Sequence, residues 1–324
     1  MTVTFAATLQ PAQPPHWSRV FRTLTLWQVS AAMLRALFSI VLLAAAFSLT
    51  PGSLDWTELF ALGPGKLALC LLLSGLLIWL LAWRWRFVVS KQGDGRQTVP
   101  GIVSFLRLTW LALATNQVLP SVVAGDALRV SLLARQGVPA IKAAGSVVVD
   151  RLYGLAALAF MCIPAAWLMG ADLLRPSVVV IACLVAAAAA AVAVSFAVPR
   201  AVGLLKRVRL AAGSMTSLRD SLVMVPAAVA GHLVNIAIFL IIADALGAGL
   251  PVLPAAAVMS VVLLAGVLPF SVAGWGIREF TLVHAFGGMG IDQEKIVLAS
   301  VAYGLVLFFT QALGFSLLIW RARS

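Results

Sequence analysis

The sequence predicts an all-helical protein that crosses a membrane several times and carries two helical hairpins that enter the membrane and turn back. Of the 324 residues, 62% are hydrophobic and 10% are charged, and the mean hydropathy is +1.06. Water-soluble domains do not have this composition. In addition, a pattern with a proline, a glycine and an arginine occurs twice within apolar sequence. Helix breakers and charges are costly in hydrocarbon, so their repetition indicates a site rather than ordinary spans.

Residues 1–30 form an N-terminal tail, and residues 31–324 form a single membrane domain. Apolar residues recur at helical spacing from Trp17 to Trp27, with Arg19 and Arg22 on another face. This pattern is typical of a helix that lies on the membrane surface, and a simple run-in to the first span explains it equally well.

Six apolar segments are long enough to cross the hydrocarbon core as helices. They cover residues 33–49, 66–88, 143–169, 178–198, 222–243 and 296–320. The second segment ends in Trp83-Arg84-Trp85-Arg86, which is typical of side chains anchored at the membrane interface.

Two further apolar stretches are interrupted, and the part after each break is too short to cross. The first comprises residues 102–119 and 127–133, and the second comprises residues 255–268 and 277–286. We interpret each stretch as a re-entrant hairpin. Broken backbone at membrane depth is tolerated only where protein or a water-filled cavity covers it.

The two breaks carry the same pattern, Val-Leu-Pro-x-x-Val-Ala-Gly-x-x-(Leu/Ile)-Arg, at residues 118–129 and 267–278. Between residues 118–130 and 267–279, seven of the thirteen positions are identical, where chance would give about one. Further on, Tyr153-Gly154-Leu155 matches Tyr303-Gly304-Leu305 at nearly the same offset. The repeat cores therefore extend over residues 102–155 and 255–305.

The basic residues predict the orientation of the spans. With the N-terminus in the cytoplasm and each hairpin returning to its own face, all but four of the 23 lysines and arginines lie at or near the cytoplasmic side. Three full spans separate the hairpins, so the hairpins enter from opposite faces and form an inverted repeat, as in many secondary transporters. Both termini are then cytoplasmic. The net charge of +12 marks cytoplasmic loops and not nucleic-acid binding.

Six ionisable residues follow the breaks or lie near the start of the next span. They are Asp126, Arg129, Asp150, Arg151, Arg278 and Glu279. We expect a half-helix to begin just after the glycine of each break, with its free N–H groups directed toward the membrane midplane. An arginine beside such a helix start suits a phosphate or a carboxylate. Two such sites that face each other would hold a lipid head group.

Polar, small and helix-breaking residues form the breaks themselves. They are Asn116, Gln117, Pro120, Gly125, Pro269, Gly274 and Gly276. Asn116 and Gln117 either line a cavity or cap the broken backbone.

A structural alternative accounts for the same charges. Arg129 pairs with Asp126 or Asp150 only to neutralise buried charge, and Arg278 pairs with Glu279 for the same reason. In this alternative, Asp150-Arg151 is a pair at the cytoplasmic interface. The two interpretations are compatible if one arginine keeps a free donor edge.

The sequence holds no pattern that predicts an enzyme, a metal site or a bound cofactor. His232 and Asn235 share a helical face, where a hydrogen-bonded buried histidine is favoured over a proton relay toward Asp244. We find no metal-ligand spacing, no nucleophile beside a base, no phosphate loop and no carboxylates placed for hydrolysis. The three cysteines lie within apolar runs and predict no disulfides.

Four motifs resemble the signatures of the lysylphosphatidylglycerol synthase transmembrane, or flippase-like, family, which forms the membrane half of the bacterial multiple peptide resistance factor. They are Asn116-Gln117-Val118-Leu119-Pro120, Gly125-Asp126-x-x-Arg129, Asp150-Arg151 and Gly274-x-Gly276-x-Arg278-Glu279. The resemblance extends from about residue 98 to the C-terminus. The family often has Gly-Gly-Asp where this chain has Ala124-Gly125-Asp126.

The resemblance implies a membrane domain that moves a lipid between leaflets, with the six ionisable residues along the lipid path. We therefore expect a transporter of an anionic or phosphate-bearing lipid, such as a phospholipid, a polyprenyl phosphate or a hopanoid-type lipid, in the bacterial inner membrane. The alternative is a non-transporting scaffold or accessory subunit of a lipid- or glycan-modifying enzyme. Because the family also occurs beside glycosyltransferases and hopanoid genes, a glycosyltransferase or a lipid-synthesis enzyme is the implied protein partner. We do not expect synthesis of an aminoacylated lipid, because the sequence contains no soluble aminoacyl-transferase domain.

Overall fold

The computed structural model describes residues 26–49, 54–92, 99–118, 122–168, 217–266, 274–287 and 289–316. Over these ranges the secondary structure is helical, without strands. Four helical segments are long and apolar enough to cross a membrane, at Trp56–Lys91, Ala140–Cys162, Leu218–Ala245 and Gln293–Phe315. The predicted all-helical, membrane-spanning class is therefore confirmed. The predicted span at 178–198 and nearly all of the surface helix from Trp17 to Trp27 lie outside the described residues.

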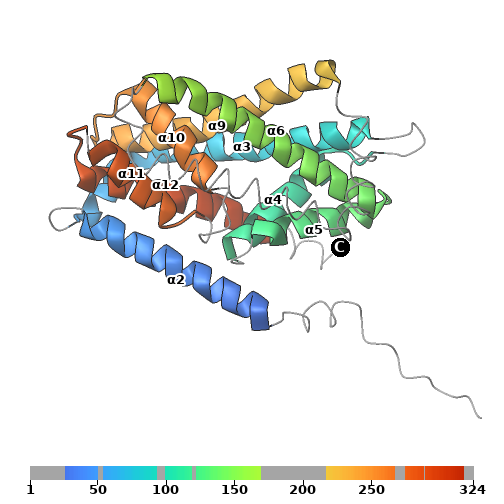
Figure 1. Cartoon of the computed structure of the whole chain (residues 1–324), viewed down its shortest axis with the longest axis horizontal. Coiled ribbons are helices and arrows are strands. Elements are labelled where there is room, and N and C mark those ends of the chain that lie inside the picture. Colours follow the sequence, from blue (N-terminus) through green and yellow to red (C-terminus); the bar gives the residue numbers. More distant parts are fainter. Residues whose placement is uncertain are drawn as a thin grey trace, which may run out of the picture.

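Helix α2, Leu26–Ser48, begins earlier than the predicted first span at 33–49. It lies along one edge of the bundle, where it contacts α11 (Figure 1). Its large apolar side chains, including Met33, Leu34 and Ile40, are mostly exposed, which suits a helix that faces lipid on several sides.

Two antiparallel helices, α3 (Gly63–Lys91) and α9 (Leu218–Ala245), define the two ends of the bundle. The short helix η1, Trp56–Leu62, leads into α3. Lys66 at the start of α3 binds Asp244 at the end of α9, and Lys91 at the end of α3 binds Asp220 at the start of α9, both at 2.9 Å. We call these the Lys66 end and the Lys91 end.

Helices α4 (Ile102–Val118) and α5 (Val122–Ala134) pack against each other as a pair. The base of this pair is closed by a hydrogen bond from the Ser104 hydroxyl to the side-chain carbonyl of Gln136, at 2.7 Å. The segment before α4 is tied to the end of α3, because the Nε of Arg86 donates to the carbonyl of Pro100 at 3.2 Å. The α4–α5 pair therefore has its base at the Lys91 end.

Helices α10 (Val252–Gly266) and α11 (Ile277–Gly287) form the second pair. The chain enters this pair from Gly247, whose carbonyl accepts a bond of 3.4 Å from Lys295 near the start of α12 (Gln293–Ala312). Glu294 also accepts from the backbone N–H of Asp55, next to η1. The α10–α11 pair therefore has its base at the Lys66 end, and Figure 1 places the two pairs at opposite ends of the bundle.

A long helix follows each pair. Helix α6, Ala140–Leu168, follows α4–α5, and α12 with its short extension η4, Leu313–Phe315, follows α10–α11. Helix α9 contacts both long helices as well as α3 and α10. The tyrosine of each Tyr-Gly-Leu motif binds α9: Tyr153 shares a hydrogen bond of 3.0 Å with Ser221, and Tyr303 donates to Asn235 at 2.6 Å. Pro226 lies inside α9 between these two contacts.

Candidate functional site

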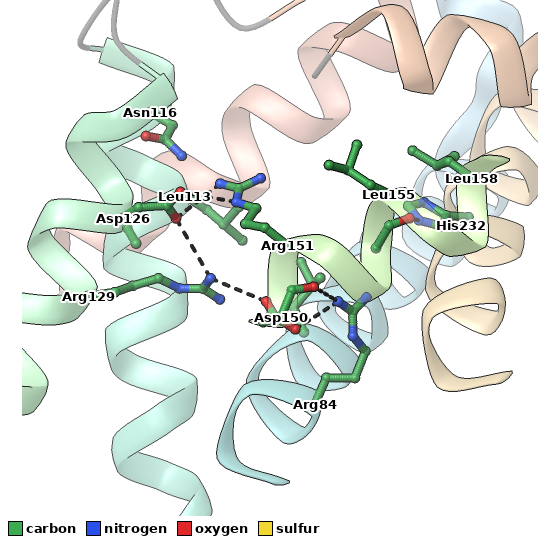
Figure 2. Close-up of a pocket in the computed structure, with 13 residues that line it drawn as sticks. Arg84, Leu113, Asn116, Asp126, Arg129, Asp150, Arg151, Leu155, Leu158 and His232 are labelled. Atoms are coloured by element: carbon green, nitrogen blue, oxygen red, sulfur yellow. Dashed lines mark hydrogen bonds and ion pairs between the residues drawn. The ribbon is translucent and has the colours of Figure 1, made fainter. Parts of the chain in front are cut away.

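A pocket lies between the α4–α5 pair and helices α3, α6 and α9 (Figure 2). Its volume is about 120 Å³, well above the roughly 10–15 Å³ that one water needs and below the roughly 300 Å³ of the smallest sites for drug-sized ligands. The charged residues that line it are Arg84, Asp126, Arg129, Asp150 and Arg151. Its size suits a small polar group, such as a phosphate, rather than a whole lipid.

Asp150 is the more deeply buried acid of the pocket, and Arg84 holds it. The Nη2 of Arg84 donates to the Asp150 carboxylate at 2.7 Å and to the Asp150 backbone carbonyl at 2.8 Å. The two side chains are 4% and 5% exposed. Removal of Asp150 would leave the charge of Arg84 buried and unpaired, so this pair stabilises the fold as well as lining the pocket.

Arg84 and Trp85 show that the interpretation of residues 83–86 as an interface anchor is wrong for these two side chains. Arg84 lines the pocket. Trp85 is fully buried, packs against the ring of Phe105, and donates from its indole N–H to Ser146 at 3.0 Å. A Trp-Arg run has the same sequence whether its arginine extends to the interface or turns inward to a carboxylate, so the sequence carried no signal for Arg84.

Asp126 and Arg151 form the second ion pair, on the more open side of the pocket. The Nε and Nη2 of Arg151 each donate to one oxygen of Asp126, both at 3.1 Å. This is the two-bond geometry that arginine makes with a carboxylate. The side chains are 41% and 21% exposed, so water screens this pair more than it screens Arg84 and Asp150.

Arg129 lies between the two acids without a close bond to either one. Its Nη1 is 3.9 Å from Asp126 and 3.5 Å from Asp150, and its Nη2 makes a long contact of 3.4 Å to Thr109. The guanidinium carbon is 4.6 Å from the centre of the Trp85 ring, a cation–π distance. The Nε is buried without a hydrogen-bond partner. Arg129 is therefore a buried cation with unused donors, as an anion site requires.

The charges of the pocket do not balance. Among the described residues that line it, three guanidinium groups face two carboxylates, which leaves one excess positive charge. His232 also lines the pocket, and its Nε2 lies 3.1 Å from the carbonyl of Gly154. This contact confirms the hydrogen-bonded histidine that the sequence favoured, while Asp244 pairs with Lys66 at the end of the bundle. An excess buried charge is costly unless an anion compensates it.

Asn116 and Gln117 have different roles in the structure. The side-chain carbonyl of Asn116 lines the pocket and accepts from the backbone N–H of Gly125 at 2.9 Å, so it caps the broken backbone. The amide of Gln117 donates to Gln311 at 2.9 Å and joins α4 to the last part of α12. Pro120 and Pro269 lie outside the described residues.

Gly125 is not the start of a half-helix, and this part of the prediction is wrong. Helix α5 begins at Val122, so Asp126 and Arg129 follow its first turn. A Cβ at Gly125 would lie 2.5 Å from the backbone carbonyl of Ala112 on α4. The residue is a glycine because α4 and α5 are in close contact, and not because the chain needs a left-handed turn there.

The second copy follows the prediction more closely. Gly274 and Gly276 have positive φ angles of 83° and 86°, which favour glycine, and α11 begins directly after them at Ile277. The backbone N–H of Gly276 donates to Glu279 at 2.8 Å, so this carboxylate caps the start of α11. A Cβ at Gly276 would also overlap the backbone carbonyl of Ser39 on α2.

Arg278 and Glu279 pair with each other and do not line the pocket. The Nε and Nη2 of Arg278 donate to one Glu279 oxygen at 2.9 and 2.5 Å, and Ser300 binds both partners at 2.9 and 2.8 Å. The guanidinium carbon lies 4.7 Å from the Trp275 ring and 5.2 Å from the Tyr303 ring. This cluster is electrically balanced and enclosed. It matches the structural alternative, in which Arg278 serves to neutralise Glu279.

The structure thus brings Asp126, Arg129, Asp150 and Arg151 together and adds Arg84, while Arg278 and Glu279 form a separate cluster. Within the described ranges, no three His, Cys, Asp or Glu side chains are grouped so that they would hold a metal ion.

Comparison with protein families matches residues 28–314 to the family described as Lysylphosphatidylglycerol synthase TM region. The chain belongs to this family. The match covers both repeat copies and every charged residue of the pocket, and it confirms the resemblance seen in the motifs. No curated protein and no solved structure gives a significant match to the chain.

Proposed function

We propose that this protein is a lipid translocase that moves an anionic or phosphate-bearing lipid between the two leaflets. The observation that carries the proposal is the unbalanced charge of the pocket, in which Arg129 is buried with unused donors between two acids. Arginine binds phosphate through several N–H donors at once, and ionisable groups at membrane depth are functional more often than not. Membership of the flippase-like family supports the same conclusion.

In the proposed arrangement, six full spans accompany two re-entrant hairpins, α4–α5 and α10–α11, which enter from opposite faces as an inverted repeat. The opposite positions of the two bases, at the Lys91 end and the Lys66 end, support it. In this proposal the protein lies in the bacterial inner membrane, and the positive-inside rule favours a cytoplasmic position for both termini.

The proposed mechanism is alternating exposure of the pocket to the two sides of the membrane. Arg129 binds the phosphate of the head group while the acyl or prenyl chains stay in lipid. The protein catalyses no covalent step and uses no cofactor in this scheme, so movement runs down a gradient or is coupled to an ion. The membrane lipid is its main partner, and a lipid-synthesis enzyme or a glycosyltransferase is the protein partner that supplies or consumes it.

Transfer of labelled phosphatidylglycerol in proteoliposomes tests the proposal. We expect the wild-type protein to raise the transfer rate above that of empty vesicles, and Arg129→Gln to return it to that level. The matched control is Arg107→Gln, which removes one arginine charge from an exposed position on α4. Wild-type transfer by a folded Arg129→Gln protein would contradict the proposed site. If the wild-type protein adds nothing to the transfer of any anionic lipid, a scaffold role replaces the translocase.

A further inference from the structure

The two acids of the pocket differ in how firmly they are held. Asp150 is 5% exposed and receives a bond of 2.7 Å from Arg84, whose own side chain is 4% exposed. Asp126 is 21% exposed, and its partner Arg151 is 41% exposed, with both bonds at 3.1 Å. Loss of Asp150 would strand a buried guanidinium, whereas loss of Asp126 would leave Arg151 partly hydrated. Asp126 is therefore the acid that an incoming anion can replace as a partner of the arginines.

Asp126 also occupies the position that an incoming anion needs. It lines the pocket and takes two donors of Arg151, and it lies 3.9 Å from the Nη1 of Arg129. The unpartnered Nε of Arg129 and the long distances around its guanidinium show that no carboxylate satisfies this cation fully. In Figure 2, Asp126 lies beside both guanidinium groups, on the α5 side of the pocket.

We propose that Asp126 is an internal competitor of the lipid phosphate: its carboxylate binds Arg151 and weakens the attraction of Arg129 for an anion, so that the head group can be released. The inference rests on the proposed function and assigns Asp126 a role opposite to that of a head-group ligand. The Asp126 carboxylate and a phosphate bound in the same pocket are both negative, and like charges repel each other strongly in a poorly solvated site. A carrier needs binding that is strong enough for loading and weak enough for release, and a competing acid provides the second condition.

The competition predicts a gain of affinity on removal of the acid. Asp126→Asn keeps the size of the side chain and raises the excess charge of the pocket by one. We expect the full-length protein in detergent to bind dihexanoyl phosphatidylglycerol about tenfold more tightly, equivalent to about 1.4 kcal/mol, by isothermal titration calorimetry. We expect slower transfer in proteoliposomes, because release is delayed. Asp126→Glu, which keeps the charge, should bind within about twofold of wild type.

The outcomes separate the two proposals. If Arg129→Gln abolishes binding while Asp126→Asn leaves it unchanged or weakens it, the competitor role is wrong and the translocase proposal stands. If Arg129→Gln binds the lipid as the wild type does, the proposed site is wrong, and the competitor role with it. Inorganic phosphate is the second probe: a gain on Asp126→Asn that is confined to free phosphate would overturn the lipid role. Dihexanoyl phosphatidylcholine, whose head group has no net charge, should gain less than the anionic lipid.

Discussion

The two copies of the repeat carry the same arginine but place its acid differently. In the first copy, Arg129 faces Asp150 on the following long helix, and this acid is already bound by Arg84. In the second copy, Ser300 takes the place of Asp150, since each lies three residues before the tyrosine of its Tyr-Gly-Leu motif. The acid that binds Arg278 is instead its neighbour Glu279. The two acids near Arg129 are each bound by another arginine, so Arg129 keeps unused donors. Glu279 binds Arg278 directly, so the donors of Arg278 are occupied. The place of the carboxylate therefore decides whether an arginine at this position is available to a ligand.

The glycine of the Tyr-Gly-Leu motif differs in the same way. A Cβ at Gly154 would lie 3.5 Å from Arg84, an ordinary contact, whereas a Cβ at Gly304 would overlap Arg278 and approach the Trp275 ring to 2.7 Å. In the first copy there is space beside Arg84, whereas in the second copy Arg278 and Trp275 fill the corresponding space. The second copy therefore encloses its arginine, whereas the first copy leaves its arginines beside a pocket.

The largest expected effect is the loss of the enclosed acid. Glu279→Gln would leave Arg278 buried without a counter-charge, and its single amide oxygen cannot accept from Arg278 and from Gly276 at once, so we expect the free energy of unfolding to fall by about 3 kcal/mol or more. Asp126→Asn, in the open pocket, should lower it by about 1 kcal/mol or less. Titration with SDS in mixed micelles measures both. Equal losses would show that the two copies are equally open.

Alanine at the two matched glycines should have unequal effects. Gly304→Ala must displace Arg278 or the Trp275 ring, which we expect to lower the free energy of unfolding by about 1–3 kcal/mol. Gly154→Ala meets only a contact at van der Waals distance, so a change within about 0.5 kcal/mol is expected. The difference in midpoint temperature, followed by tryptophan fluorescence, gives the comparison. A Gly154→Ala protein that is the less stable of the two would reverse our assignment.

The caps of the two breaks provide a smaller test. Asn116→Ala removes the acceptor for the N–H of Gly125, and we expect a loss of about 1 kcal/mol, as for other side-chain caps. The control is Thr115→Ala on the same helix, whose hydroxyl donates to the carbonyl of Leu111 within α4. It should cost less than Asn116→Ala. If the two variants are equally stable, the bond to Asn116 does not hold the first break together.

The smallest effects should come from the ends of the bundle. Lys66→Gln breaks a pair in which both side chains are exposed, by 45% and 78%, and should change the free energy of unfolding by about 0–0.5 kcal/mol. Lys91→Gln leaves Asp220, which is only 7% exposed, and should cost about 1 kcal/mol. The same SDS titration measures both variants. A loss at Lys66 as large as that of Glu279→Gln would mean that end contacts, and not the enclosed acid, stabilise the second copy.

Much of the fold follows from the sequence because hydropathy and residue identity act over whole segments. The long helices α3, α6, α9 and α12 lie where apolar runs of spanning length predict them. The family resemblance implied that six ionisable residues belong to one lipid path, and the structure brings four of them, Asp126, Arg129, Asp150 and Arg151, together.

The rest depends on side-chain direction, which the pattern does not specify. Arg84 is part of an alternating Trp-Arg run that reads as an anchor, and only the packing of α3 against α6 turns it toward Asp150. Gly125 and Gly276 occupy similar places in the repeat, yet one allows a close helix contact and the other a positive φ. The pairing of Arg278 with its neighbour Glu279 was one of the two interpretations that the sequence offered, and the pattern did not decide for it, because adjacent residues on a helix normally point apart.

The proline in α9 lies close to the attachment points of both repeat copies. One tyrosine from each copy is bonded to α9, and Pro226 lies between the two attachment points. Proline interrupts the backbone hydrogen bonds of a helix and is a common place for a bend. The first copy is bonded to α9 on both sides of this proline, through Tyr153 at Ser221 and through the carbonyl of Gly154 at His232, so a bend at Pro226 would act on the wall of the pocket itself. His232 in the pocket and Asn235, which accepts from Tyr303, lie on the same side of the proline, so the two copies share this segment of α9.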